Sequence, residues 1–172
     1  MMYGLTSTSP APLVPCSTVV GVWDYANVVL SAKQYLRCDS PSVIAPLLSA
    51  MIRSYGRLDG AHAYLDAGRS LHWVRQTIAE NGFTIVDAPD HPQGDGYKSS
   101  VDPAIISDLI AMGYERDPGT LVLASGDRDF LIPVERLRRR RWHVVVIGVR
   151  NSTSTDLIAA SDEFIPLTIP AA

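Results

Sequence analysis

The stretch TLVLASGDRDFLIPVERLRRRRWHVVVIG, residues 120–148, holds two apolar segments separated by a charged, helix-like one. TLVLAS (120–125) and WHVVVIGV (142–149) are apolar on both faces, which is typical of buried strands. DFLIPVERLRRRR (129–141) is predicted to be the helix between them. Two such strands joined by a helix require parallel pairing, because the connection must cross over the sheet. The stretch therefore predicts a βαβ unit.

The same alternation runs through the rest of the chain. Strands are predicted at 18–24, 60–66, 83–89 and, as a last edge strand, 163–167. Helices are predicted at 40–56, 69–82, 103–115 and 155–161, and a loop rich in Gly and Pro at 90–100. Helices that connect parallel strands cover both faces of the sheet. The predicted fold is a three-layer α/β/α sandwich with a mainly parallel central sheet.

Composition indicates one globular domain. The chain has 172 residues, of which 47% are hydrophobic and 19% charged, with a formal net charge of −3. These values exclude a disordered chain, and no segment approaches the ~18 consecutive apolar residues of a membrane span. The domain is predicted to cover 18–167, between a flexible leader rich in Pro and Ser at 1–17 and a short tail at 168–172.

The two cysteines, Cys16 and Cys38, lack the spacing of CxxC or Cys/His ligand pairs. A zinc site is therefore not expected, and a reducing compartment is favoured. The amino terminus lacks a basic segment followed by an apolar run, so no secretion signal is expected. We expect a cytoplasmic protein that does not associate with membranes. The sequence leaves the oligomeric state open.

Carboxylates follow two of the predicted strands, at the edge where ligands bind in parallel sheets. Asp24 ends the first strand and has Asn27 three residues on, and Asp127 and Asp129 follow TLVLA in the turn SGDRDF. Asp24 and Asn27 can equally be turn residues that satisfy local backbone groups. Asp129 can be the N-cap of the arginine-rich helix, whereas no such structural role is predicted for Asp127. Because Asp127 and Asp129 are two residues apart, both carboxylates can approach one cation.

Other polar residues begin or line predicted helices. Asp102 precedes Pro103, which is a strong signal of a helix start, and an N-cap carboxylate can also turn one oxygen toward a metal. Asp108 lies six residues later on another side of the helix, in an otherwise apolar stretch, and is a supporting candidate. Ser154 is predicted to cap the helix 155–161.

Proline and serine also mark the first predicted helix, at 40–56. Ser40 is the expected N-cap and Pro41 the expected first helical residue. Pro46 is expected to start or kink this helix, because it has no N–H to donate to the preceding turn.

Five of the six residues 136–141 are arginines. Such a run is usually a solvated helix end, where the helix dipole favours positive charge. Arginine also pairs well with phosphate through its planar guanidinium, so a contact with nucleic acid is a second interpretation. The sequence contains no GxxxxGK[ST], GxGxxG, GxSxG or HExxH motif, which excludes the common nucleotide, serine-hydrolase and zinc-protease sites.

Several of these segments resemble the NYN domain family of PIN-like nucleases, which includes the LabA-like group. They are VVGVWDYANV at the first strand, Lys98 and Asp102 before a helix, the strand followed by SGDRDF, and the closing pattern STSTDLIAASDEFIPL. The closing pattern places Ser154, Leu157, Asp162 and Phe164 at the family's spacing. The resemblance covers about residues 18–167.

The resemblance implies a PIN-like fold and a divalent-metal ribonuclease site. It implies that Asp24, Asp102, Asp127 and Asp129 are the catalytic and metal-binding acids, with Asp108 in support. Asn27, Ser125, Lys98 and Ser154 are then expected to bind substrate. Ligands that are all oxygen select Mg²⁺ or Mn²⁺, and the expected reaction is hydrolysis of single-stranded RNA by a metal-activated water.

Two other functions remain as alternatives. One is an inactive module of the same fold that binds RNA or a protein partner, although a binder has no reason to concentrate acids where RNA lies. The other is a metal-dependent phosphohydrolase that acts on small phosphate esters. The sequence does not distinguish RNA from DNA.

Overall fold

The computed structural model describes residues 18–67, 70–88, 91–93 and 96–170, with backbone alone for 91–93 and 96–98. The predicted leader at 1–17 lies outside the described residues, as do the last two positions of the predicted tail. None of the helices in the described ranges is long and apolar enough to cross a membrane.

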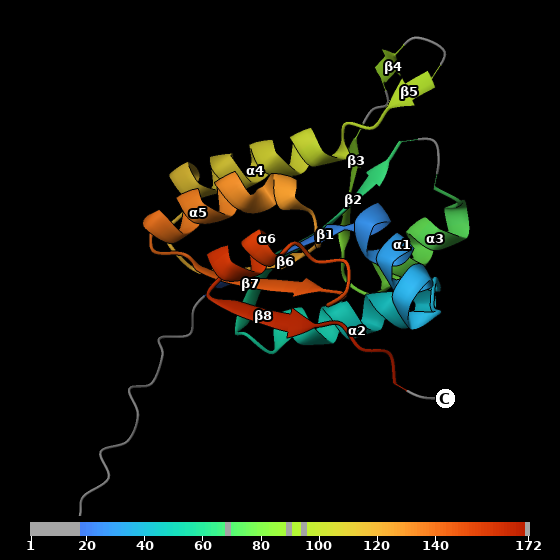
Figure 1. Cartoon of the computed structure of the whole chain (residues 1–172), viewed down its shortest axis with the longest axis horizontal. Coiled ribbons are helices and arrows are strands. Elements are labelled where there is room, and N and C mark those ends of the chain that lie inside the picture. Colours follow the sequence, from blue (N-terminus) through green and yellow to red (C-terminus); the bar gives the residue numbers. More distant parts are fainter. Residues whose placement is uncertain (1–17, 68–69, 89–90, 94–95, 171–172) are drawn as a thin grey trace, which may run out of the picture.

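A six-stranded parallel sheet, in the order β3-β2-β1-β6-β7-β8, forms the centre of the fold (Figure 1). Its strands are β1 (Thr18–Asp24), β2 (Arg57–Asp66), β3 (Thr84–Ala88), β6 (Thr120–Ala124), β7 (His143–Gly148) and β8 (Glu163–Pro166). The helices are α1 (Tyr25–Leu36), α2 (Pro41–Arg53), α3 (His72–Glu80), α4 (Val101–Glu115), α5 (Leu131–Arg139) and α6 (Thr155–Ala160), with a short 3-10 helix, η1 (Arg128–Phe130), before α5.

The chain builds the sheet outward from β1 in two directions. β2 and β3 are added on one side, and the chain then crosses back to place β6, β7 and β8 on the other. The strand order therefore reverses between β1 and β6. In parallel sheets, ligands bind outside the carboxyl ends of the strands at such a reversal.

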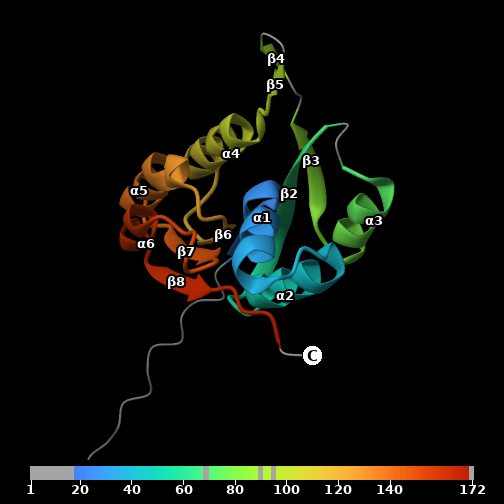
Figure 2. The ribbon, with the colours of Figure 1, turned by 45° about the vertical axis from the view of Figure 1, so that its right-hand side comes forward.

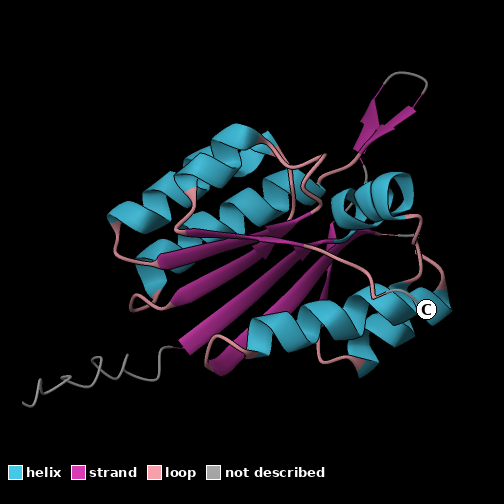
Figure 3. Ribbon diagram, turned by 60° about the horizontal axis from the view of Figure 1, so that its bottom comes forward, coloured by secondary structure: helices cyan, strands magenta, loops and turns pink. Residues whose placement is uncertain are grey.

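Helices cover both faces of the sheet and create two hydrophobic cores (Figures 2 and 3). α1, α2 and α3 pack on one face, where Leu48 and Ile78 are fully buried. α4, α5 and α6 pack on the other face, around Ile105 and Leu137. The predicted three-layer α/β/α sandwich is confirmed, and its six-stranded sheet is parallel throughout.

One helix and one hairpin differ from the sequence prediction. α1 begins directly after β1, and it buries Val28 and Ala32, four residues apart, against the sheet. No breaker separates this helix from the strand, so its start is marked only by Asp24, which accepts a hydrogen bond from the Asn27 backbone N–H. The predicted loop at 90–100 contains an antiparallel pair, β4 (His91–Gln93) and β5 (Gly96–Lys98). The sequence indicated only a loop there because Gly and Pro are common in turns.

Asp102 and Asp129, each of which could have been an N-cap, occupy other positions. Asp102 is the second residue of α4, whose N-cap position is Ser100; an acid in this first turn is favoured by the helix dipole. Asp129 lies inside η1, and the cap is Asp127, which accepts a hydrogen bond from the Asp129 backbone N–H at 2.9 Å. Asp127 therefore has a local structural role that the sequence did not indicate.

The other start signals agree with the structure. Ser40 occupies the N-cap position of α2 and Pro41 is its first residue, and Ser154 accepts a hydrogen bond from the Leu157 backbone N–H at the start of α6. Pro46 does not start α2 but lies inside it. Pro46 is exposed, so the carbonyl that it leaves without a helical donor can be hydrated.

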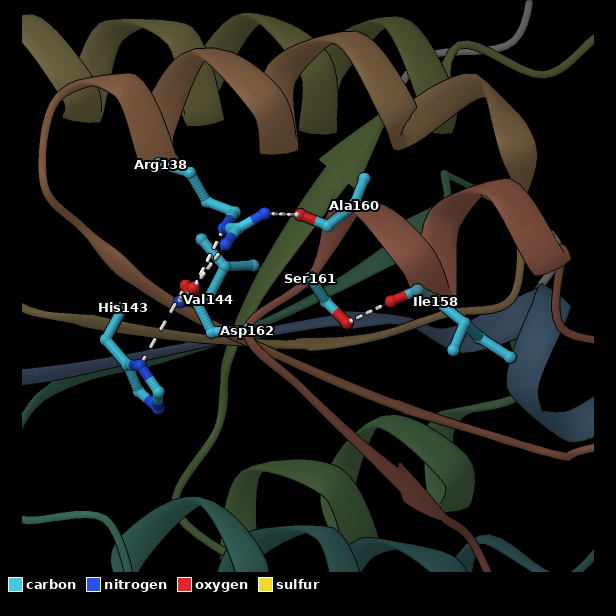
Figure 4. A network of polar contacts seen from close by, with 7 residues as sticks. All are labelled: Arg138, His143, Val144, Ile158, Ala160, Ser161 and Asp162. Carbon is cyan, nitrogen blue, oxygen red and sulfur yellow. Dashed lines mark hydrogen bonds and ion pairs between the residues drawn. The ribbon is translucent and has the colours of Figure 1, made fainter.

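The closing sequence pattern fixes the last strands of the sheet (Figure 4). Asp162, between α6 and β8, accepts hydrogen bonds from the Val144 backbone N–H and from Arg138 Nε, both at 2.9 Å. Arg138 also donates to the Ala160 carbonyl. Burial alone would raise the pKa of Asp162, but these hydrogen bonds and the charges of Arg138 and His143 hold that pKa below its usual 3.8. Arg138 of the arginine run is therefore a structural residue.

Candidate active site

Five carboxylates from four segments gather at the carboxyl edge of the sheet. Asp24 ends β1 and Asp66 ends β2, while Asp127 and Asp129 follow β6. Asp102 comes from the first turn of α4. Because β1 and β6 are neighbours, Asp24 and Asp127 lie on the two sides of the reversal in strand order. The sequence predicted this position for four of the five acids.

A chain of hydrogen bonds joins the ends of β1 and β6. Ser125 Oγ donates to Asp24 Oδ2 at 2.9 Å and accepts from the Asp127 backbone N–H at 3.2 Å. Asn27 Oδ1 accepts from the Gly126 backbone N–H at 2.9 Å. Asn27 and Ser125 therefore hold the two acidic segments in place. For Asn27 this agrees with the alternative that it satisfies local backbone groups, whereas Ser125 was expected only to bind substrate.

Asp24 is the buried member of the group, with a relative exposure of 2%. Burial raises its pKa from 3.8 to about 6, and the negative charges of Asp102 and Asp127 add to this rise. The hydrogen bonds from Ser125 and the Asn27 backbone oppose it without cancelling it. A carboxylate that is hard to ionise alone gains most from a nearby cation.

Asp102 has a raised pKa for similar reasons. Burial is the main cause, followed by the charges of Asp127, Asp129 and Asp66. Asp66 was missed by the sequence analysis, although it closes an apolar strand just as Asp24 does. Its Oδ1 accepts a hydrogen bond from Ser99 Oγ. Asp102 therefore lies close enough to Asp66, Asp127 and Asp129 for their negative charges to disfavour its ionisation.

The oxygen-rich edge fits a hard divalent cation. Within the described ranges, no three His, Cys, Asp or Glu side chains lie close enough to form a complete metal site by themselves. Mg²⁺ does not require such a cage, because it usually binds through one or two carboxylates and keeps several waters. Asp24 and Asp127, with Asp102 beside them, supply carboxylate oxygens alone, which suits Mg²⁺ or Mn²⁺ and not a softer ion.

A shallow hollow of about 390 Å³ adjoins the acids on the β7 side. Its walls are formed by the start of α1, the segment after β6 and the loop after β7, which contribute Asn27, Gly126, Asp127, Arg128, Asn151, Ser152, Thr153 and Ser154. A Cβ at position 126 would lie 2.9 Å from Thr153 Cα, so only glycine allows the loops to approach this closely. Hydroxyls and amides of this kind can hydrogen-bond a phosphate or sugar, and Ser154 is thus placed next to the acids.

Two predicted site residues stand apart. Asp108 accepts a hydrogen bond from Tyr64 Oη at 2.7 Å. It lines a separate cavity of about 210 Å³ along α4, because six helical residues carry it away from Asp102. The supporting role predicted for Asp108 thus has no counterpart among the contacts of the acidic edge. The side chain of Lys98 lies outside the described part of the chain.

The NYN domain family profile matches residues 19–168. The chain belongs to the NYN domain family. Members of this family are generally nucleases, and its fold is nuclease-like. The fold is also similar to the crystal structure of a protein of unknown function from Vibrio parahaemolyticus, with a TM-score of 0.78 and 23% identity over 91% of this chain and 96% of that one. At this identity the likeness concerns the fold alone, and among curated proteins none matches this NYN domain.

Proposed function

We propose that this NYN domain is a Mg²⁺- or Mn²⁺-dependent endoribonuclease that hydrolyses phosphodiester bonds of single-stranded RNA. The observation that carries the proposal is that Asp24 and Asp127 lie on the two sides of the strand reversal, where Ser125 Oγ donates to the Asp24 carboxylate and accepts from the Asp127 backbone N–H. The negative charge of Asp102 contributes to the raised pKa of Asp24. The negative charge of Asp127 contributes to the raised pKa of Asp102. A free Cys38 suits a reducing compartment, and we place the activity in the cytoplasm.

Each side chain has a role in this proposal. Asp24 and Asp127 hold the cation, and Asp102 and Asp129 bind it directly or through water. When bound, the cation acidifies a water and offsets the charge that develops on the phosphate. Ser125 keeps Asp24 oriented by donating to one of its oxygens. No protein nucleophile is required, because water attacks the phosphorus.

The hollow beside the acids supports the binding of substrate there. It is open and shallow, and Ser152, Thr153 and Ser154 line it together with Asn27. Arg128 also lines it and pairs with Asp156 at 2.9 Å, so its charge is partly compensated. A backbone phosphate held among these groups would lie next to Asp127. Lys98 is proposed as a further phosphate contact.

The alternatives make different use of the same residues. A binding module without turnover has no need for a buried carboxylate whose ionisation is unfavourable, such as Asp24. A phosphohydrolase for small esters would need a deeper pocket around the acids than the open hollow that adjoins Asp127. The first observation favours turnover over binding alone, and the second favours a polymeric substrate over a small ester.

The test is incubation of the purified chain with end-labelled single-stranded RNA and Mn²⁺, beside Asp127→Asn. We expect internal cleavage by the parent and loss of cleavage in the variant, with RNA binding unchanged or slightly tighter. Losing a metal ligand affects the transition state more than the ground state. RNA binding without cleavage would favour the inactive module, and hydrolysis of p-nitrophenyl phosphate without RNA cleavage would favour the phosphohydrolase.

A further inference from the structure

The arginine run ends at a second hollow, far from the acids. This hollow, of about 250 Å³, lies where the C-termini of α4 and α5 meet, and it is lined by Gly113, Arg116, Pro118, Arg139, Arg140 and Arg141. Four guanidinium groups therefore surround one small space. The two helices run side by side on the same face of the sheet (Figure 1).

Of the five arginines at positions 116, 136, 139, 140 and 141, three have side-chain partners among the described residues and two do not. Arg116 pairs with Asp59 at 2.8 Å and Arg139 with Glu135 at 3.4 Å. Arg136 and Arg141 have no ion pair or side-chain hydrogen bond to another described residue. The acids that flank Arg116 in sequence, at positions 115 and 117, do not line this hollow. Positive charge is thus left available at the surface.

An exposed aromatic ring accompanies these charges. Tyr114 is 63% exposed, and the Arg140 guanidinium lies 4.4 Å from the centre of its ring. Arg140 Nε also donates to the Gly113 carbonyl, which fixes its position. A basic surface that includes an exposed aromatic ring is typical of single-strand binding, because phosphates pair with arginine and bases stack on the ring.

α5 connects this surface to the acids. Asp129 lies just before α5 and Arg140 just after it, a separation of about 16 Å at 1.5 Å for each residue. Ile132, which is 61% exposed, and Arg136 lie between them on the outer side of the helix. An extended strand of a few nucleotides can follow this path from the acids to the hollow.

We infer that the arginine surface, formed by Tyr114, Arg116, Arg136, Arg139, Arg140 and Arg141, holds the phosphates of an RNA strand that extends beyond the acidic edge. This inference rests on the proposed function for the class of ligand. Its consequence is that affinity depends on RNA length: a short strand reaches the acids alone, whereas a longer one also reaches the arginines.

The test compares Arg136→Gln/Arg141→Gln with Arg37→Gln/Arg53→Gln, a control that removes the same charge from exposed positions at the C-terminal ends of α1 and α2. Binding of labelled 2-nucleotide and 12-nucleotide single-stranded RNA is measured by fluorescence anisotropy with chelator, so that no cleavage occurs. Arg136 and Arg141 make no side-chain hydrogen bonds to other described residues, so the test variant should melt like the parent.

We expect the test variant to lose affinity for the 12-mer and to keep its affinity for the 2-nucleotide strand, which is too short to span the distance of about 16 Å between the acids and the hollow. The slope of log affinity against log salt concentration should become less steep by about 0.7 for each phosphate contact that is lost. For two lost contacts the change is about 1.4. Over a tenfold range of salt, this corresponds to about 25-fold in affinity. An unchanged slope, or an equal loss in the control variant, would overturn the inference.

The same variants separate this inference from the proposed function. If the parent cleaves RNA with Mn²⁺ but the arginine variant binds the 12-mer as the parent does, the arginine surface is refuted and the nuclease stands. If no cleavage occurs but 12-mer binding still depends on Arg136 and Arg141, the nuclease is refuted and the arginine surface stands. If the nuclease proposal and the arginine surface are both correct, the arginine variant should show a higher KM for the 12-mer and an unchanged kcat.

Discussion

Replacing Asp24 with Asn should stabilise the metal-free protein at neutral pH. Burial and the neighbouring acids raise the pKa of Asp24 from 3.8 to about 6, and each pH unit of difference corresponds to about 1.4 kcal/mol. Keeping this carboxylate ionised at pH 7 therefore costs the fold about 3 kcal/mol. Asn caps a helix as well as Asp does, so it retains the bond to Asn27 and can donate to Ser125.

The pH dependence follows from the direction of the shift. The pKa of Asp24 is higher in the folded state than in the unfolded state. Its contribution to the free energy of unfolding is therefore most favourable below pH 3.8 and is lost as the pH rises through about 6. The stability advantage of Asp24→Asn should therefore be small near pH 4, grow until about pH 6 and then stay constant. At about 2–4 °C for each kcal/mol in a chain of this size, the rise in Tm at pH 7 is about 6–12 °C.

Thermal denaturation with chelator, from pH 4 to pH 8, measures this effect. Asp129→Asn is the matched control: it removes the same charge from the same edge, but its side chain is exposed, so its stability should change by about 0.5 kcal/mol or less. A variant at Asp24 that melts lower than the parent at pH 7, or an advantage that does not change with pH, would refute the reasoning.

Three further predictions follow from other contacts. Mn²⁺ must displace the proton of Asp24, so its affinity, measured by calorimetry, should fall about tenfold for each pH unit below about 6; an affinity independent of pH would exclude Asp24 as a ligand. Ser125→Ala removes a bond that lowers the pKa of Asp24, so the acidic limb of the pH–rate profile should move to higher pH, and an unmoved limb would contradict this. Asp162→Asn should destabilise the fold by about 1–3 kcal/mol in chemical denaturation. Because the folded pKa of Asp162 is lowered, the difference should be full above pH 4 and disappear as the pH falls through that pKa; a difference that persists at pH 2 would argue against the ion pair with Arg138.

Much of the fold was predictable because its strands are apolar on both faces. β6 is buried at all five positions, and such a strand can only lie inside a parallel sheet covered by helices. The acids at the ends of β1 and β6 followed from this, since the carboxyl ends of parallel strands meet at one edge. Asp24 and Asp127 were placed correctly for that reason.

The missed features depend on tertiary contacts. α1 has no break before it and only Val28 and Ala32 are fully buried, so its pattern is weak in the sequence. Asp66 joins the acids because β2 pairs with β1 in a register that sets Tyr64 opposite Asp24, and pairing of this kind is not visible in one strand. The different roles of the arginines also depend on tertiary contacts. Arg138 donates to Asp162, which is distant in sequence, whereas Arg136 has no side-chain partner among the described residues.

The most direct test of the central claim is a Mn²⁺ titration in which metal binding, followed by electron paramagnetic resonance, and cleavage of single-stranded RNA are measured on the same samples of the parent and Asp24→Asn. The account predicts that cleavage by the parent rises with the fraction of Mn²⁺ bound, at one common midpoint. It also predicts that Asp24→Asn loses both signals while remaining folded. Cleavage that persists in chelator, or Mn²⁺ binding that is the same in Asp24→Asn as in the parent, would contradict the assignment of these acids as the metal site.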